Sequence, residues 1–124
     1  MTIRVFLVED THHLQNAIRD LLQSLGDFAV VSTARTEAEA NLWLLDNPGG
    51  WDLAVIDLIL EQGTGMGVIA KCRRSNDGGR VMIFSDYATP GIRRHCLGLG
   101  AHVTIAKTDV NVFMDYCAAL APAN

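Results

Sequence analysis

In LAVID, residues Leu53–Asp57, four consecutive apolar residues are followed at once by a carboxylate. A strand that is apolar on successive residues suits a parallel sheet buried on both faces. The stretch VMIF, residues Val81–Phe84, repeats the pattern, and Ser85 and Asp86 follow it. The sequence therefore predicts buried parallel strands with polar residues just beyond their carboxyl ends.

Runs of this kind alternate along the chain with stretches of helical period. Leu14, Ile18 and Leu21, for example, lie at i, i+4 and i+7, which is typical of an amphipathic helix. We expect strands at residues 4–8, 28–34, 53–56, 80–84 and 102–106, and helices at residues 12–25, 37–47, 68–74, 90–97 and 110–120. Strands that alternate with helices predict a doubly wound α/β fold, with a parallel sheet between two layers of helices.

The second expected helix has the clearest start signal. Thr36 and Glu39 form a capping box, in which each side chain can accept a hydrogen bond from the backbone of the first turn. Within this helix we expect Leu42 and Leu45 to face the core. Thr89, which precedes a proline, is expected to cap the fourth helix.

The composition limits the classes of function. The chain has 124 residues, which suits one domain covering residues 1–124 with its core at about residues 3–120. It is 49% hydrophobic and 19% charged, too apolar for a disordered protein. A net charge of -4 argues against direct nucleic-acid binding and against an anionic membrane surface. No apolar run approaches the ~18 residues of a membrane helix. Cys72, Cys96 and Cys117 fit no zinc pattern, so we expect buried thiols in a cytoplasmic protein.

Polar residues gather where the expected strands end. Glu9 and Asp10 follow the first strand, Asp57 the third, Ser85 the fourth and Lys107 the fifth. In open α/β sheets, ligands bind outside the carboxyl ends of the strands. The acids, the hydroxyl and the lysine are therefore predicted to converge at one edge of the sheet.

This set of side chains predicts phosphoryl chemistry. Two carboxylates about 4 Å apart repel each other by ~4 kcal/mol at an effective dielectric constant of about 20, so a crowded cluster raises a pKa or recruits a cation. A few carboxylates with several waters suit Mg²⁺. A carboxylate beside the ion can attack phosphorus, and a hydroxyl and a lysine can bind the phosphoryl oxygens. The pattern predicts an aspartate that accepts a phosphoryl group.

The chain from Ile3 to Leu120 resembles a response-regulator receiver domain of two-component signalling. The matching features are the Glu9-Asp10 pair, Asp57 within Val-Ile-Asp-Leu, Gly65 eight residues later, Ser85, and Lys107 after Gly-Ala-His-Val-Thr-Ile-Ala. The resemblance implies a flavodoxin-like (βα)5 fold with strand order 2-1-3-4-5, of which chemotaxis receivers are a known example.

The resemblance also implies roles for the acids. Asp57 would accept a phosphoryl group from the phosphohistidine of a histidine kinase or of a histidine phosphotransfer protein. Mg²⁺ would be bound directly by Asp10 and Asp57, through water by Glu9, and by the backbone carbonyl of Ile59. The chain would then be a signalling switch that slowly loses its phosphoryl group, and not a turnover enzyme.

Ser85 and Lys107 would bind the phosphoryl group, and here the sequence departs from the family's pattern. Thr104 stands where an aromatic residue is usual, and Asp86 where a small residue is usual. Thr104 therefore predicts a switch without aromatic gating, with Tyr87 filling the space near Ser85. Asp86 is expected either to hinder the anionic donor or to turn outward.

Residues near the acceptor also predict its lifetime. Ile59 and Tyr87 lie two residues after Asp57 and Ser85, where the family tunes hydrolysis. Bulky groups at these positions would exclude the attacking water, so we expect a long-lived phosphoryl group.

Two questions stay open from the sequence alone. Arg93, Arg94 and His95 form either a solvated basic face or a docking surface, since the family uses its fourth and fifth helices for dimers and output partners. The altered switch also fits a receiver-like interaction module that works without phosphate. A phosphohydrolase with an aspartate nucleophile is disfavoured, because it would need a second acid two residues after Asp10, where His12 stands.

Overall fold

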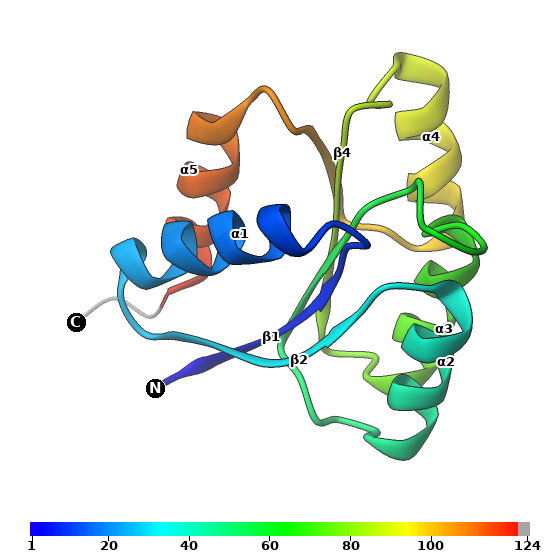
Figure 1. The fold of residues 1–124 in the computed structure, drawn as a ribbon, viewed down its shortest axis with the longest axis horizontal. Coiled ribbons are helices and arrows are strands. Elements are labelled where there is room, and N and C mark those ends of the chain that lie inside the picture. The colour runs from blue at the N-terminus through cyan, green and yellow to red at the C-terminus, as the bar shows by residue number, and fades with distance from the viewer. Residues whose placement is uncertain (122–124) are drawn as a thin grey trace.

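The computed structural model describes residues 1–121, in which five strands alternate with five helices. The elements are β1 (Ile3–Val8), α1 (His12–Leu25), β2 (Phe28–Ala34), α2 (Glu37–Asp46), β3 (Leu53–Ile56), α3 (Met66–Ser75), β4 (Arg80–Ser85), α4 (Pro90–Leu99), β5 (Val103–Ala106) and α5 (Val110–Leu120). The strands form one parallel sheet in the order β2-β1-β3-β4-β5 (Figure 1). The predicted α/β fold and strand order are confirmed.

The strand register brings the carboxyl ends of the central strands to a common edge. Val8, the last residue of β1, pairs with Ile56, the last residue of β3, and Ile56 pairs with Ile83 in β4. Ser85, at the end of β4, pairs with Ala106 at the end of β5. The residues that follow these strands therefore start from neighbouring points, as expected at the ligand-binding edge of an open sheet.

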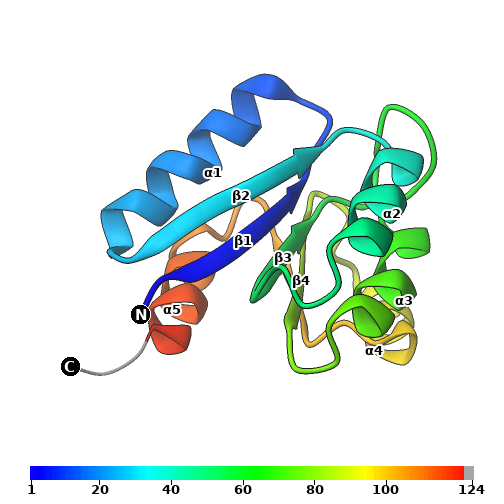
Figure 2. The same cartoon turned by 90° about the horizontal axis from the view of Figure 1, so that it is seen from below.

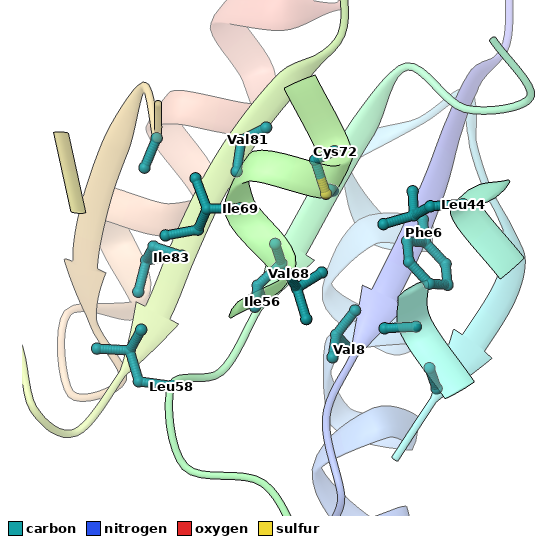
Figure 3. Packing of buried hydrophobic residues seen from close by; sticks show 14 of the residues in the cluster. Phe6, Val8, Leu44, Ile56, Leu58, Val68, Ile69, Cys72, Val81 and Ile83 are labelled. Carbon is teal, nitrogen blue, oxygen red and sulfur yellow. The ribbon is translucent and has the colours of Figure 1, made fainter. Parts of the chain in front are cut away.

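Helices cover both faces of the sheet. α1 and α5 lie on one face, and α2, α3 and α4 lie on the other (Figures 1 and 2). Each face has its own buried cluster: Phe6 packs with Leu44 under α2–α4 (Figure 3), and Leu7 packs with Phe113 under α1 and α5. Because neighbouring residues of β1 are buried on opposite faces, this strand is apolar on successive positions, as the sequence indicated.

α2 packs on the sheet through a different face from the one predicted. Ala40 and Leu44 are buried and Trp43 packs against the same cluster, whereas Leu42 and Leu45 are 60% and 77% exposed. The prediction that Leu42 and Leu45 face the core is therefore wrong. Helical residues follow one another at about 100°, so a helix that buries Ala40 and Leu44 leaves Leu42 and Leu45 on its outer side.

The predicted caps fix two helix starts. The Thr36 hydroxyl accepts a hydrogen bond from the Glu39 N–H, and the Thr89 hydroxyl accepts one from the Ile92 N–H. α3 begins at Met66, two residues earlier than predicted, and its N-cap residue is a glycine with no side chain to mark the start. A helix start without a capping side chain leaves little signal in the sequence.

No helix within residues 1–121 is both long and apolar enough to cross a membrane. The cysteines Cys72, Cys96 and Cys117 are free and buried, as predicted. Burial raises the pKa of Cys72 and of Cys117 to about 12, so both thiols stay protonated at neutral pH.

Candidate functional site

Three carboxylates meet at the carboxyl edge of β1 and β3. Glu9 and Asp10 follow β1 directly, and Asp57 follows β3. Each can offer an oxygen to one point, since these oxygens all lie within 4.8 Å of one another. Glu9 is 1% exposed and Asp57 is 7% exposed, while Asp10 is partly exposed. The structure thus brings the three predicted acids together in a largely buried cluster with one member open to solvent.

Lys107 reaches this cluster from the end of β5. Its ammonium donates to Oε1 of Glu9 at 2.7 Å and to Oδ2 of Asp57 at 2.9 Å. Burial works against the charged form, but the hydrogen bonds to the two carboxylates outweigh it and raise the pKa of Lys107. One cation therefore bridges two acids that arise from different strands.

Both oxygens of Glu9 are already occupied. Oε1 accepts from Lys107, and Oε2 accepts from the Thr11 N–H at 3.0 Å. The Gln15 amide donates to the Glu9 carbonyl at 2.7 Å and holds this residue from α1. Burial raises the pKa of Glu9, and its hydrogen bonds to Lys107 and Thr11 offset only part of that effect. Glu9 therefore stabilises the cluster, and both of its own carboxylate oxygens accept hydrogen bonds from the protein.

Asp57 and Asp10 keep oxygens open. Among residues 1–121, no hydrogen bond reaches Oδ1 of Asp57 or Oδ2 of Asp10. Oδ1 of Asp10 accepts only from the Thr11 hydroxyl, at 3.3 Å. These two acids therefore present the oxygens that a hard cation or an electrophile could approach.

The loop after Asp57 fits closely against the site. A Cβ added at Gly65 would collide with the Asp57 carbonyl oxygen and with the Ile56 side chain. The Gly65 N–H donates to the Leu58 carbonyl at 2.9 Å, which closes the loop over the strand end. Ile59 lies in this loop with its side chain 53% exposed. The glycine that the resemblance singled out is required by contact with the site itself.

Ser85 lies beside this cluster at the end of β4 and is fully buried. Its hydroxyl accepts a hydrogen bond from the Tyr87 N–H at 3.3 Å. Tyr87 is 54% exposed, and that its side chain fills the space near Ser85 stays a prediction. Asp86 is exposed, as expected for the outward orientation, and whether it hinders the anionic donor stays a prediction. A charged side chain at this tight turn reaches solvent more cheaply than it can be buried without a partner.

Thr104 is buried in β5, and its hydroxyl has no hydrogen-bond partner among the described residues. Arg93 of α4 turns toward it: the guanidinium donates to the Thr104 carbonyl and to the Ala88 carbonyl. Arg94 and His95 are exposed, whereas Arg93 is not. The predicted basic face of α4 therefore has two outward members, and Arg93 instead joins α4 to β5.

Three site-supporting residues were not predicted. Gln15 is one of the buried residues of α1, and a polar residue among apolar ones on a helix face is the signal that could have identified it. Arg35 donates to the Asp10 carbonyl at 3.1 Å and pairs with Glu61 at 3.3 Å. It follows β2 directly, as the other site residues follow their strands. Arg93 acts on backbone carbonyls, which every residue has, so the sequence gives no signal for its partner.

The family model of the response regulator receiver domain matches residues 5–115. The match covers most of the chain and includes every site residue described above. The chain therefore belongs to the receiver domain family of two-component response regulators.

Solved structures show the same fold. A LuxR-family two-component response regulator from Aurantimonas sp. SI85-9A1 has a TM-score of 0.85 and 23% identity, over 97% of this chain and 85% of that chain. The CheX-CheY-BeF3-Mg²⁺ complex from Borrelia burgdorferi has a TM-score of 0.84 and 19% identity, over 97% and 90%. A response regulator from Burkholderia pseudomallei with a phosphorylated aspartic acid, a calcium ion and citrate has a TM-score of 0.79 and 19% identity, over 90% and 64%.

Proposed function

We propose that this receiver domain is a phosphorylation-activated switch in which Asp57 accepts the phosphoryl group. The observation that carries the proposal is the state of the Asp57 carboxylate. It is largely buried, Lys107 holds Oδ2, and Oδ1 has no hydrogen bond from residues 1–121. An oriented carboxylate with one open oxygen is suited to act as a nucleophile.

In the proposed step, a carboxylate oxygen of Asp57 forms a bond to the phosphorus of a phosphohistidine. The P–N bond of the donor breaks, and its electron pair stays on the imidazole of the histidine kinase or histidine phosphotransfer protein. Asp57 becomes an acyl phosphate. Lys107, now 2.9 Å from Asp57, moves its hydrogen bond to a phosphoryl oxygen, and Ser85 turns its hydroxyl toward another.

The residues present fit Mg²⁺. The donor set is three carboxylates whose oxygens lie within 4.8 Å of one another, and hard oxygen donors with room for water suit this ion. Asp10 would hold it through its open oxygen and Asp57 through the carboxylate oxygen that does not attack phosphorus, with the Ile59 carbonyl as a further ligand. Glu9 would act through water, because both of its oxygens already accept hydrogen bonds. The ion would supply positive charge against the carboxylates and the phosphoryl oxygens.

The response to phosphorylation would travel from Ser85 to β5 and α4. The new group adds a charge of about -1.5 to -2. Movement of Ser85 and Lys107 toward it would change the surroundings of Thr104, which Arg93 connects to α4. The outward surface of α4 and α5 would then bind an output partner or a second copy in the cytoplasm, with no direct contact to nucleic acid or membrane.

A mass measurement tests the acceptor. Incubation with acetyl phosphate and Mg²⁺ should add one phosphoryl group to the wild type and none to Asp57→Asn. Asp86→Asn is the matched control, because it removes an exposed acid from the same edge and should still be phosphorylated. Phosphorylation of Asp57→Asn would contradict the assignment, as would an unmodified wild type.

The buried Thr104 in place of an aromatic residue favours a second candidate, an interaction module that works without phosphate. Under that function the wild type would stay unmodified and would bind its partner equally well as Asp57→Asn. Slow loss of the phosphoryl group after donor removal, followed by mass, would instead support the switch and the long lifetime predicted from Ile59 and Tyr87.

A further inference from the structure

α2 is apolar on two opposite faces. Ala40 and Leu44 are buried in the core, while Leu42 and Leu45 are 60% and 77% exposed on the outside. An exposed apolar patch bordered by polar residues marks an interaction surface on a soluble protein. The second face of α2 is therefore a surface that lacks its partner in a single copy of the chain.

This face borders a groove between α2 and α3, which lie side by side in both views (Figures 1 and 2). The groove has a volume of about 440 Å³, and its apolar lining includes Leu42, Leu45 and Pro48. Asn41 also lines it, and its buried Oδ1 has no hydrogen-bond partner among the described residues. The groove is apolar, with an acceptor that lacks a donor.

Charges of opposite sign flank the apolar stripe. Lys71 and Arg74 of α3 line the groove on one side and are exposed. Glu39 and Asp46 of α2 are also exposed. At about 100° per residue, they lie on the side of Leu42 away from Asn41, and Asn41 faces the groove. The outer face therefore consists of three parallel bands, which are acidic, apolar and basic.

We infer that this face, which we name the α2–α3 face, binds a second copy of the chain. A two-fold axis that lies in the interface and runs along α2 would place apolar band on apolar band. It would also place the acidic band of each copy opposite the basic band of the other. Each acidic band then contacts a basic band of the other copy, so the patch is complementary to itself, as an isologous dimer requires. A partner of uniform charge would instead meet repulsion from one of the two bands.

The first test is the mass of the protein in solution. Sedimentation velocity from about 1 μM to about 1 mM, a range that spans weak to moderate affinity, should show a monomer–dimer equilibrium. Leu42→Ser with Leu45→Ser should raise the dissociation constant at least tenfold. Val31→Ser is the matched control, because Val31 is a 43% exposed apolar residue of β2 and lies outside both this face and the α4–α5 surface. A wild type that stays monomeric throughout would overturn the inference, as would a dimer that only the Val31 variant weakens.

Charge reversal tests the predicted axis. The pair Glu39→Lys with Asp46→Lys should weaken self-association, and so should Lys71→Glu with Arg74→Glu. An equimolar mixture of the two variants should form a heterodimer at least as tight as the wild-type dimer, because each reversed band then meets its opposite. Failure of the mixture to associate would overturn the geometry. Circular dichroism of each variant shows that it is folded.

The inference is independent of the phosphoryl site. Asp57→Asn changes only the acceptor, so it should dimerise as the wild type does in the absence of phosphate. A monomeric Asp57→Asn would contradict the inference that the dimer forms independently of the phosphoryl site. Failure of Asp57 to accept a phosphoryl group would leave the dimer unaffected.

Discussion

The candidate site has two halves that are built differently. The acidic half consists of Glu9, Asp10, Asp57 and Lys107, and the switch half consists of Ser85, Thr104 and Arg93. In the acidic half, one ammonium bridges two buried carboxylates from different strands. In the switch half, a buried hydroxyl lacks a partner among the described residues, and an arginine from α4 binds the β5 backbone instead. The residues at the strand ends are thus held together by hydrogen bonds between charged groups, whereas α4 is joined to β5 through a contact of Arg93 with the backbone of Thr104.

The largest expected loss of stability comes from a substitution that removes the cation of the acidic half. Lys107→Met keeps an unbranched side chain, one atom shorter, but leaves the two carboxylates close together without their cation. Removal of one partner from a buried ion pair costs about 3–5 kcal/mol of unfolding free energy. Urea denaturation would measure the loss. Arg94→Met, at an exposed position of α4, should stay within about 0.5 kcal/mol of the wild type. Equal stabilities for the two variants would show that the bridge does not hold the site together.

The next effect concerns the loop that closes the acidic half. Gly65→Ala should destabilise the domain by about 1–3 kcal/mol, because the new Cβ would collide with the Asp57 carbonyl. Gly98→Ala provides the opposite case: nothing lies within 4 Å of its Cβ position in α4. There the better helix former should stabilise the domain by about 0.5–1 kcal/mol. Thermal unfolding would give both signs, and a neutral Gly65→Ala would contradict the close fit.

A smaller effect should separate the switch half from the acidic half. Arg93→Lys removes the planar fork that reaches two carbonyls and should cost about 1 kcal/mol of stability. Hydrogen exchange should become faster at the start of α4 and near Thr104. Arg94→Lys, on the exposed side of the same helix, should change neither quantity. Unchanged exchange in the Arg93 variant would mean that α4 is held to β5 by other contacts.

The smallest expected effect is a pH dependence of the unfolding free energy that arises from His102, just before β5. Nδ1 of His102 accepts a hydrogen bond from the Val81 N–H at 3.0 Å, which only a neutral ring can do. Burial, assisted by Arg73 and Arg80, lowers the pKa of His102. Its contribution to stability is therefore complete above the unfolded value of about 6.5 and declines as the pH falls below it. The unfolding free energy of His102→Gln should decrease less than that of the wild type between pH 7 and about pH 5.5. Parallel curves would contradict this role.

The acidic half was predictable because its residues depend on local signals. Each of Glu9, Asp57 and Lys107 directly follows a short apolar run, and parallel strands bring such positions to one edge. The switch half was less predictable, because Arg93 binds backbone carbonyls that no residue type identifies. The same limit applies to α2. Leu42 and Leu45 were expected inside because they are apolar, but Ala40 and Leu44 form the inner face. A helix that is apolar on both sides gives no periodic signal to decide between them.

A titration with beryllofluoride and Mg²⁺, followed by NMR at the backbone amides, tests the central claim most directly. The claim is that phosphorylation of Asp57 causes a structural change that extends through Ser85 to Thr104 and α4. The wild type should show saturable shifts at Ser85, Lys107, Thr104 and the start of α4, and Asp57→Asn should show none of them. Shifts confined to residues near Asp57 and Lys107, with Thr104 and α4 unchanged, would contradict the proposed switch.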